Sequence, residues 1–367
     1  MNAKKVRIIL VSLVAVLWLG LSVFAWLAPA KEMSEAERRK LQQLPKISAE
    51  NILNGMFMRE FESYTQDQFP MRDTFRRLKA LFSYDVLHKL DNNGIYIADG
   101  FAAQMEYPLD QRQLDGAAAK FQKIYDLYLR GNCDNILFAV VPDKGYYLAE
   151  ENGYLSMDYD TVHETMAQLT WAQQVDIRDC LTGRDYYRTD THWRQERLLP
   201  VAQKLTAALG VTAPNMEDYT VTALERPFYG VYYGQAALPM EPETIFLLEN
   251  ELLCSCTVTN HETGKTASVY DMDKLTSRDL YDVYLSGPAA LLTIENPNAA
   301  THRELIVFRD SFGSSLIPLL IADYATVTVI DTRYVVTEYV GNFVDFHGQD
   351  VLMLYSTLVL NNSDALR

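Results

Sequence analysis

Cysteine and basic residues are scarce in this 367-residue sequence, and their scarcity excludes several classes of protein. The four cysteines include no Cys-x-x-Cys pair and no Cys/His cluster with zinc-ligand spacing, so we expect no metal and no other cofactor. Four cysteines are too few for a disulfide scaffold of this length. We interpret Cys254 and Cys256 as small apolar side chains on one strand face, with a strained local disulfide as the alternative.

Basic residues are outnumbered by acidic ones. The sequence has 33 Lys and Arg against 48 Asp and Glu, which gives a net charge of −15. Nucleic-acid phosphates need clustered Lys and Arg, so this balance argues against a nucleic-acid partner and against tight binding to anionic lipid. A hydrophobic content of 49% excludes global disorder, and the length suits one large domain with accessory segments or two domains.

One long hydrophobic run lies at the N-terminus. Ile8–Leu27 contains no charge, and twenty helical residues span about 30 Å, the thickness of the hydrocarbon core of a bilayer. Lys4, Lys5 and Arg7 precede the run, and this positive flank should remain cytoplasmic. We therefore expect residues 1–30 to be an uncleaved anchor of a single-pass membrane protein whose remainder is extracytoplasmic. A cleaved signal peptide is the alternative, and it would export the same remainder.

A polar segment and a helical segment follow the anchor. Glu32–Lys46 is rich in charge and predicts a stalk, and Ala49–Leu90 carries apolar residues at helical spacing. The turn signal Asn92-Asn93-Gly94 then precedes a short strand at 95–97. These patterns predict an anchor at 1–30, a stalk and helical juxtamembrane segment at 31–90, and a main domain at 91–367.

The main domain alternates between helical and strand patterns. Helices are expected at 117–129, 161–171, 194–209 and from 311 to 324. The expected strands are apolar, β-rich runs at 136–141, 174–177, 304–308, 326–330 and 351–355. This order predicts an α/β fold with a mostly parallel sheet of about five strands between two layers of helices. Residues 211–287 break the alternation, and we interpret them as an insertion that folds over the sheet.

A serine stands at one strand-to-helix junction. The run Arg309-Asp310-Ser311-Phe312-Gly313-Ser314 follows an apolar strand and is expected to open a helix. Open α/β sheets place their sites at the carboxyl ends of their strands. Backbone N–H groups at a helix start stabilise the oxyanion that forms when a serine attacks an ester carbonyl. A serine that only caps the helix is the alternative to a nucleophile.

An aspartate and a histidine stand two residues apart at a second junction. The run Tyr187-Arg188-Thr189-Asp190-Thr191-His192-Trp193 is expected just after a strand and just before a helix. A tight turn would let Asp190 hold the imidazole of His192, as a general base requires, and His192 would activate Ser311. An Asp/Thr cap with an incidental histidine is the alternative. Lys144 follows a third buried strand and is a candidate for binding an anionic or carbonyl group at the same sheet edge.

These motifs resemble those of the DHHW protein family and of the periplasmic alginate O-acetylation proteins of the SGNH hydrolase superfamily. The resemblance covers nearly the whole chain, and its most specific part is Asp190-x-His192-Trp193 followed by Asp310-Ser311-Phe312. Further matching stretches are Ser34–Arg39, Phe69–Asp73, Asn93–Tyr96, Val141–Lys144, Tyr281–Gly287 and Ile330–Tyr334.

The resemblance implies an SGNH-hydrolase-like three-layer α/β/α fold with Ser311, His192 and Asp190 as a catalytic triad. The histidine and aspartate precede the serine here, as in the alginate group. The sequence departs from the superfamily at Arg309, where a glycine is usual, so the usual oxyanion geometry is not implied. We assign Lys144, Arg309 and Gly313 to substrate-binding or oxyanion roles. The oxyanion asparagine has no counterpart supported by a motif, and Asn93 and Asn342 are the candidates.

Three functions are compatible with these features. The first is transfer of acetyl groups onto a cell-surface polysaccharide or glycopolymer, beside a membrane-bound O-acyltransferase that the resemblance implies as a partner. The second is an esterase that removes such groups, and access of water to the acyl-serine would decide between the two. The third is a non-catalytic glycan-binding or scaffold component of an export complex. The sequence identifies neither the polymer nor the acyl donor.

Overall fold

The computed structural model describes residues 3–34 and 36–367. These residues form two compact units. The N-terminal unit comprises the chain up to Asn92 together with Gly234–Pro239, and the sheet unit comprises Asn93–Tyr233 and Met240–Arg367.

An eight-stranded mixed sheet is the centre of the sheet unit. Four of its five parallel strands carry apolar runs of the sequence, the fifth is the exposed pair Gln173–Gln174, and three antiparallel strands extend one edge. In spatial order the strands are β10 (Lys265–Ala267), β9 (Thr257–Asn260), β11 (Leu291–Glu295), β13 (Tyr324–Ile330), β12 (Arg303–Arg309), β14 (Asp350–Ser356), β5 (Ile136–Val141) and β6 (Gln173–Gln174).

The predicted parallel strands are present, although the one expected at 174–177 is the two-residue β6 at Gln173–Gln174, and the predicted count of about five is too low. The additional strands are antiparallel, so they need no crossover helix and leave no strand–helix alternation in the sequence. Two of them, β9 and β10, belong to the segment 211–287, which therefore extends the sheet as well as covering it. Gly264 joins them with a φ of 68°, a conformation that glycine adopts without steric cost.

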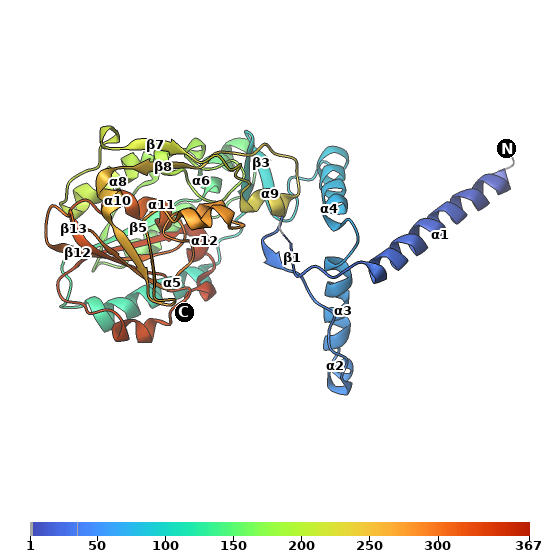
Figure 1. Cartoon of the computed structure of the whole chain (residues 1–367), viewed down its shortest axis with the longest axis horizontal. Helices are drawn as coiled ribbons and strands as arrows, with labels where there is room; N and C mark the ends of the chain where they lie inside the picture. Colours follow the sequence, from blue (N-terminus) through green and yellow to red (C-terminus); the bar gives the residue numbers. More distant parts are fainter. Residues whose placement is uncertain (1–2, 35) are drawn as a thin grey trace. The chain divides into compact units, whose positions relative to one another are not determined.

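Helices cover both faces of this sheet (Figure 1). One face packs against α8 (Leu199–Leu209) and α11 (Gly313–Leu316). The other packs against α5 (Gln111–Ile124) and α7 (Tyr159–Ala167). Successive residues of a strand point to opposite faces, so the fully buried β5 and β14 supply both cores. The predicted three-layer arrangement is therefore present.

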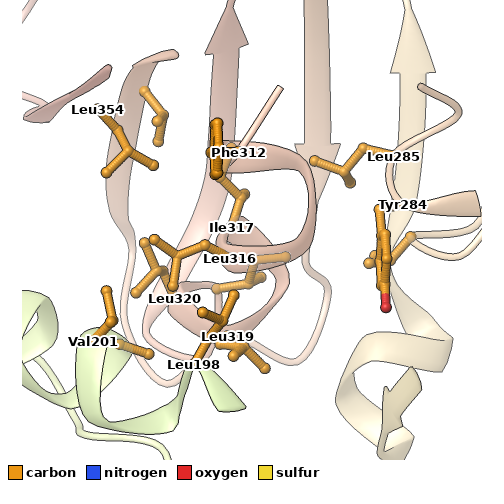
Figure 2. Close-up of a cluster of buried hydrophobic side chains, with 14 of the residues drawn as sticks. Leu198, Val201, Tyr284, Leu285, Phe312, Leu316, Ile317, Leu319, Leu320 and Leu354 are labelled. Atoms are coloured by element: carbon orange, nitrogen blue, oxygen red, sulfur yellow. The ribbon is translucent and has the colours of Figure 1, made fainter. Parts of the chain in front are cut away.

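The core on the α8 face holds in place the turn at residues 310–314, which contains Ser311 and is called the serine turn below. Figure 2 shows Leu198 and Val201 packed near Leu316 and Leu320, which follow the serine in the sequence. All four side chains are fully buried or nearly so. Burying such a side chain contributes about 1.5–3 kcal/mol, so this cluster fixes the segment after Ser311 against α8.

Several predicted helix boundaries are wrong. The helix expected at 194–209 begins only at Leu199, after a 3₁₀ turn at Gln195–Arg197, although it ends at Gly210 as expected. The helix expected from 311 to 324 is the four-residue α11 followed by a 3₁₀ helix at Ile317–Leu320, and Tyr324 already belongs to β13. Pro318 has no N–H to continue an α-helical ladder, which explains the early end.

The cysteines form no disulfide. All four are free, which matches the favoured expectation for Cys254 and Cys256. Their placement on one strand face is wrong, because Cys254 lies in helix α10 (Glu251–Ser255) and Cys256 is its C-terminal cap. An Asn250 side chain that accepts a hydrogen bond from Leu253 N starts this helix, a local signal that apolar spacing alone does not show.

Smaller elements complete the sheet unit. Hairpin strands β3 (Ile95–Ala98) and β4 (Phe101–Gln104) pair antiparallel, as do β7 (Thr220–Ala223) and β8 (Phe246–Glu249). Helix α6 (Lys144–Leu148) follows β5, and α12 (Thr357–Leu360) follows β14. Helix α9 (Val231–Ala236) begins in this unit, and its last three residues belong to the N-terminal unit.

The N-terminal unit begins with a long apolar helix. Helix α1 (Ala3–Leu27) has 25 residues, its most apolar stretch of 18 residues has a mean hydropathy of 2.7, and none of its residues is buried. It is long and apolar enough to cross a membrane, and a signal sequence near an N-terminus has the same properties.

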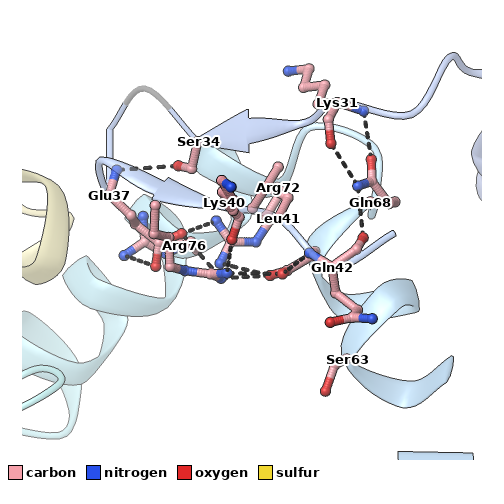
Figure 3. A network of polar contacts seen from close by, with 12 residues as sticks. Lys31, Ser34, Glu37, Lys40, Leu41, Gln42, Ser63, Gln68, Arg72 and Arg76 are labelled. Carbon is pink, nitrogen blue, oxygen red and sulfur yellow. Dashed lines mark hydrogen bonds and ion pairs between the residues drawn. The ribbon is translucent and has the colours of Figure 1, made fainter. Parts of the chain in front are cut away.

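The rest of the N-terminal unit is helical and joined by ion pairs. It contains β1 (Met33–Ser34), β2 (Arg39–Lys40), α2 (Ala49–Leu53), α3 (Met56–Asp67), α4 (Arg72–Leu81) and a π-helical turn at Phe82–Val86. Figure 3 shows Arg72 and Arg76 of α4 beside Glu37. Glu37 pairs with Arg72 and Arg76, and Asp67 accepts two hydrogen bonds from Arg39.

These charges shift the acidities of both carboxyl groups. Burial works to raise the pKa of Glu37, but Arg72 and Arg76 together outweigh it and leave the pKa below its ordinary value. The hydrogen bond from Arg39 lowers the pKa of Asp67 in the same way. Both carboxylates are therefore charged at neutral pH, and each stabilises the unit.

Candidate active site

Ser311, His192 and Asp190 lie in one hydrogen-bonded chain. His192 Nε2 is 2.8 Å from Ser311 Oγ, and His192 Nδ1 is 2.6 Å from Asp190 Oδ1. Ser311 lies two residues after the end of β12, at the carboxyl edge of the parallel strands. Asp190 and His192 are buried, whereas the serine is half-buried and open to a reactant.

The loop that carries the histidine closes on itself. Tyr186 and Trp193 form an antiparallel bridge, and Tyr187 N–H donates to His192 O at 3.0 Å. Asp190 Oδ1 accepts a hydrogen bond from His192 N–H at 3.0 Å as well as from the ring. A tight Asx turn therefore holds both groups, as two-residue spacing allows. The expectation of a junction directly between strand and helix is wrong, because β6 ends at Gln174 and α8 begins at Leu199.

The segment 211–287 holds the aspartate from its other side. Val231 N–H donates to Asp190 Oδ2 at 2.7 Å, and Gly230 N–H donates to Thr189 Oγ1 at 3.0 Å. A Cβ at Gly230 would lie 2.3 Å from Asp190 Cβ, so only glycine fits. Sequence reasoning did not find Gly230 and Val231, because a backbone donor leaves no residue-type signal.

A glutamate fixes the backbone just before the aspartate. The carboxylate of Glu243 accepts hydrogen bonds from Arg188 N–H at 2.8 Å and from Thr189 N–H and Oγ1 at 2.9 and 3.0 Å. Thr189 O in turn accepts a hydrogen bond from Tyr233 N–H at 3.1 Å. Glu243 also lies in the segment 211–287 and was not predicted as part of the site.

Tyr281 stacks on the imidazole. The two rings lie 4.0 Å apart at an interplanar angle of 8°, and the Tyr281 hydroxyl is 2.7 Å from Ser315 Oγ. Burial raises the pKa of Tyr281, so its phenol stays neutral. Trp193 Nε1 donates to Phe312 O at 3.0 Å and thus links the histidine loop to the serine turn. Tyr281 belongs to Tyr281–Gly287, one of the stretches that resemble the DHHW family, and this resemblance was the sequence signal for its place in the site.

The serine turn is held by Asp310. Its Oδ1 accepts a hydrogen bond from Phe312 N–H at 3.0 Å, and its Oδ2 accepts one from Ser356 N–H of β14 at 2.7 Å. The N-terminal cap of α11 is Phe312, without a side-chain hydrogen bond. Ser311 is therefore not a capping serine, which removes the structural alternative for this residue.

One backbone donor in the turn remains available for an oxyanion. Gly313 N–H donates to Asp310 O at 3.2 Å and Ser314 N–H donates to Ser311 O at 3.1 Å. Within residues 3–34 and 36–367, Ser311 N–H has no assigned acceptor. Asn93 and Asn342, the asparagine candidates from the sequence, are both exposed, Asn342 at the end of a 3₁₀ helix.

Lys144 lies inside the molecule. It is 2% exposed, its Nζ donates to Tyr187 O at 2.8 Å, and it lies 5.1 Å from the centre of the Tyr232 ring. Burial lowers its pKa to about 7 despite the nearby carboxylates of Asp190 and Glu243. The structure thus places Lys144 behind the histidine loop, where it supports the backbone just before Asp190.

Arg309 and Gly313 lie beneath the serine turn. Arg309 is fully buried, and its guanidinium donates to Asp310 O at 3.2 Å and to Ser314 Oγ at 3.0 Å. Asp331 lies 3.7 Å away as its ionic partner. A Cβ at Gly313 would lie 2.9 Å from Arg309 Cβ, so the arginine and the glycine require each other. Both residues shape the turn from behind.

This arrangement has the chemistry of an activated hydroxyl. An imidazole whose Nδ1–H donates to a buried carboxylate presents its other nitrogen as a base. His192 Nε2 is within reach of the Ser311 proton, and no other group is needed to remove it. No group of three or more His, Cys, Asp or Glu in residues 3–34 and 36–367 is arranged to hold a metal ion.

Comparison with known proteins agrees with the resemblance in the sequence. Residues 176–330 match the model of the DHHW protein family. This range includes Asp190, His192 and Ser311, and the predicted resemblance is confirmed. A search of curated proteins finds no match.

Solved structures share the fold at low sequence identity. A DHHW family protein from Eubacterium siraeum matches with a TM-score of 0.59 at 19% identity, covering 75% of this chain and 94% of that one. PatB1 of Bacillus cereus, in a structure with a sulfonyl adduct, matches with a TM-score of 0.56 at 14% identity, covering 72% and 97%. The O-acetyltransferase domain of Pseudomonas putida AlgJ has a TM-score of 0.44 at 14% identity, covering 73% and 92%. The first two of these structures confirm the expected three-layer α/β/α fold.

Proposed function

We propose that this chain is a serine-dependent acetyl-transfer enzyme that acts on a cell-surface polysaccharide or glycopolymer, with Ser311 as nucleophile, His192 as base and Asp190 as its partner. The observation that carries the proposal is the hydrogen-bonded chain from Asp190 through His192 to Ser311. The proposal is supported by similarity in fold to a set of proteins that includes an O-acetyltransferase domain.

The first half of the reaction forms an acetyl-serine. His192 Nε2 takes the Ser311 proton as Oγ bonds to the carbonyl carbon of the acetyl donor, and Ser311 N–H stabilises the oxyanion. The bond to the donor oxygen then breaks, and His192 returns the proton to that oxygen. In the second half an acceptor hydroxyl gives its proton to His192 and attacks the acetyl carbon, and Ser311 leaves and regains a proton.

The acceptor distinguishes a transferase from an esterase. A sugar hydroxyl as acceptor gives O-acetylation of the polymer, and water gives hydrolysis. Helix α1 tethers the enzyme to the membrane with its N-terminus in the cytoplasm, so the sheet unit works outside the cell. A membrane-bound O-acyltransferase in the same membrane supplies the acetyl group.

The test measures release of a chromophore from a small acetyl ester, and then acetyl transfer to oligosaccharides. Ser311→Ala and His192→Ala should each lower kcat/KM by about 10³-fold or more, and the double variant should fall no further, because nucleophile and base act as a unit. Ser255→Ala, a half-buried serine on α10, is the control and should keep full activity. Mass spectrometry should find the acetyl group on Ser311, and a sulfonyl fluoride should label the same residue.

A folded Ser311→Ala variant with unchanged turnover would disprove the nucleophile. A wild type without esterase or transferase activity on any ester tested would instead favour the scaffold function. Acetyl transfer that exceeds hydrolysis when oligosaccharide is added would identify the transferase.

A further inference from the structure

Helix α4 and the π-helical turn after it expose a stripe of large apolar side chains. Met71, Phe75, Leu78, Phe82 and Val86 are between 41% and 62% exposed. The first four are spaced by four, three and four residues, which places them on one side of a helix. Scattered apolar residues on a surface need no explanation, but a continuous helical stripe does.

The inward side of the same helix is small and polar. Ala80 and Ser83 are buried, and Arg72 and Arg76 pair with Glu37. A helix that covers a protein core has the opposite pattern, with its apolar side inward. Within the N-terminal unit, α4 is therefore oriented by its arginines, and its apolar stripe faces outward.

The charge of the chain is distributed unevenly along its length. Residues 1–92 have 14 Lys and Arg against 10 Asp and Glu, whereas residues 93–367 have 19 against 38. Arg77, Lys79 and Lys89 are exposed close to the stripe in the sequence. The acidity that argues against a lipid partner thus belongs to the sheet unit, and the region around the stripe is slightly basic.

We propose that α4 and the following turn lie in the surface of the bilayer, with Met71, Phe75, Leu78 and Phe82 inserted at the boundary between head groups and acyl chains. A helix with one apolar side and basic flanking residues has the composition of such interfacial helices. The stripe belongs to the same compact unit as α1, which is long and apolar enough to enter the bilayer. The long side chains of Arg77 and Lys79 reach phosphate groups while their methylenes stay in the apolar layer.

The experiment separates membrane binding by the α4 stripe from membrane anchoring by α1. The full chain, with a protease site inserted between Ala30 and Lys31, is reconstituted into vesicles of phosphatidylethanolamine and phosphatidylglycerol and then cut. The cut wild type should stay on the vesicles in a flotation assay. The variant Phe75→Glu/Leu78→Glu/Phe82→Glu should lose about tenfold or more of its bound fraction, because each glutamate is expelled from the interface.

The matched control places the same charges on the sheet unit. Leu127, Leu155 and Met272 are similarly exposed, and changing all three to glutamate should leave binding unchanged. Both triple variants should keep the unfolding midpoint of the wild type, which shows that they fold and keeps this test independent of Ser311. Release of the cut wild type from pure lipid vesicles would overturn the proposal. Retention only on native membranes would assign the stripe to a membrane protein and equally overturn it.

Discussion

The two units of this chain use their apolar residues in opposite ways. In the sheet unit, β5 and β14 are buried along their whole length and two cores cover the sheet. Among the described residues of the N-terminal unit, the buried apolar side chains are those of Leu41, Ala80, Ala236, Ala237 and Leu238. The sheet unit thus carries its stability in itself, whereas the N-terminal unit depends on ion pairs and, we propose, on the bilayer.

The largest expected contrast comes from one aspartate in each unit. Asp190→Asn should lower ester turnover by about 10⁴-fold, because the amide no longer holds the reactive tautomer of His192. Asp67→Asn removes a carboxylate that binds Arg39 in the N-terminal unit and should leave turnover unchanged. Steady-state kinetics on the two folded variants measure the contrast. Equal losses would show that the two units do not act separately.

Two glycines provide the next contrast. Gly230→Ala forces a Cβ to within 2.3 Å of Asp190 and should lower the unfolding free energy by about 3 kcal/mol. The same substitution should also abolish ester turnover, because it displaces Asp190. Gly234→Ala meets Ala36 O in the N-terminal unit and should disturb only that unit. Denaturant unfolding, with hydrogen exchange to locate the change, checks both. A Gly230→Ala variant with unchanged unfolding free energy and turnover would contradict the close packing around Asp190.

The pH dependence should follow the buried lysine. Burial lowers the pKa of Lys144 from an unfolded value of 10.5 to about 7, so between these values the unfolded chain binds more protons than the folded one. Stability should therefore rise with pH across that window, by up to about 1.4 kcal/mol per pH unit, relative to Lys144→Met. Unfolding of the two proteins from pH 7 to 10 measures the difference. A constant difference would mean that Lys144 keeps its proton throughout.

The smallest contrast compares two glutamates in ion pairs. Glu37→Gln should cost about 1–2 kcal/mol, because it leaves Arg72 and Arg76 without their carboxylate. Because the pKa of Glu37 is lowered, this contribution is full above pH 4.5 and is lost as the pH falls further. Glu338→Gln breaks the exposed pair with Lys123 and should have no measurable effect. Thermal melting at pH 7 and pH 3 tests both, and equal effects would refute the distinction.

The sequence predicted the parts of the sheet unit that depend on local pattern. Continuous apolar runs identified β5, β12 and β14, and the rule that sites lie at carboxyl ends directed attention to Ser311. Asp190 and His192 followed from their spacing, because a tight turn connects neighbours in the chain.

What the sequence could not predict depends on contacts between distant segments. Val231, Glu243 and Tyr281 reach the site from the segment 211–287, where no strand–helix alternation indicates a position in space. In the N-terminal unit the helical periodicity was visible, but periodicity does not say which side is inward. The pairing of Glu37 with Arg72 and Arg76 decides that, and it joins residues of different elements.

The position of β14 in the sheet has a consequence for how the protein matures. This strand lies between β12 and β5, and Asp143 and Thr357, 214 residues apart, bond to each other beside it. Until β14 has been synthesised, β5 and β12 have no common neighbour, and Asp310 lacks the N–H of Ser356. The emerging chain therefore cannot complete the hydrogen bonds around Ser311 until this late strand has been added to the sheet.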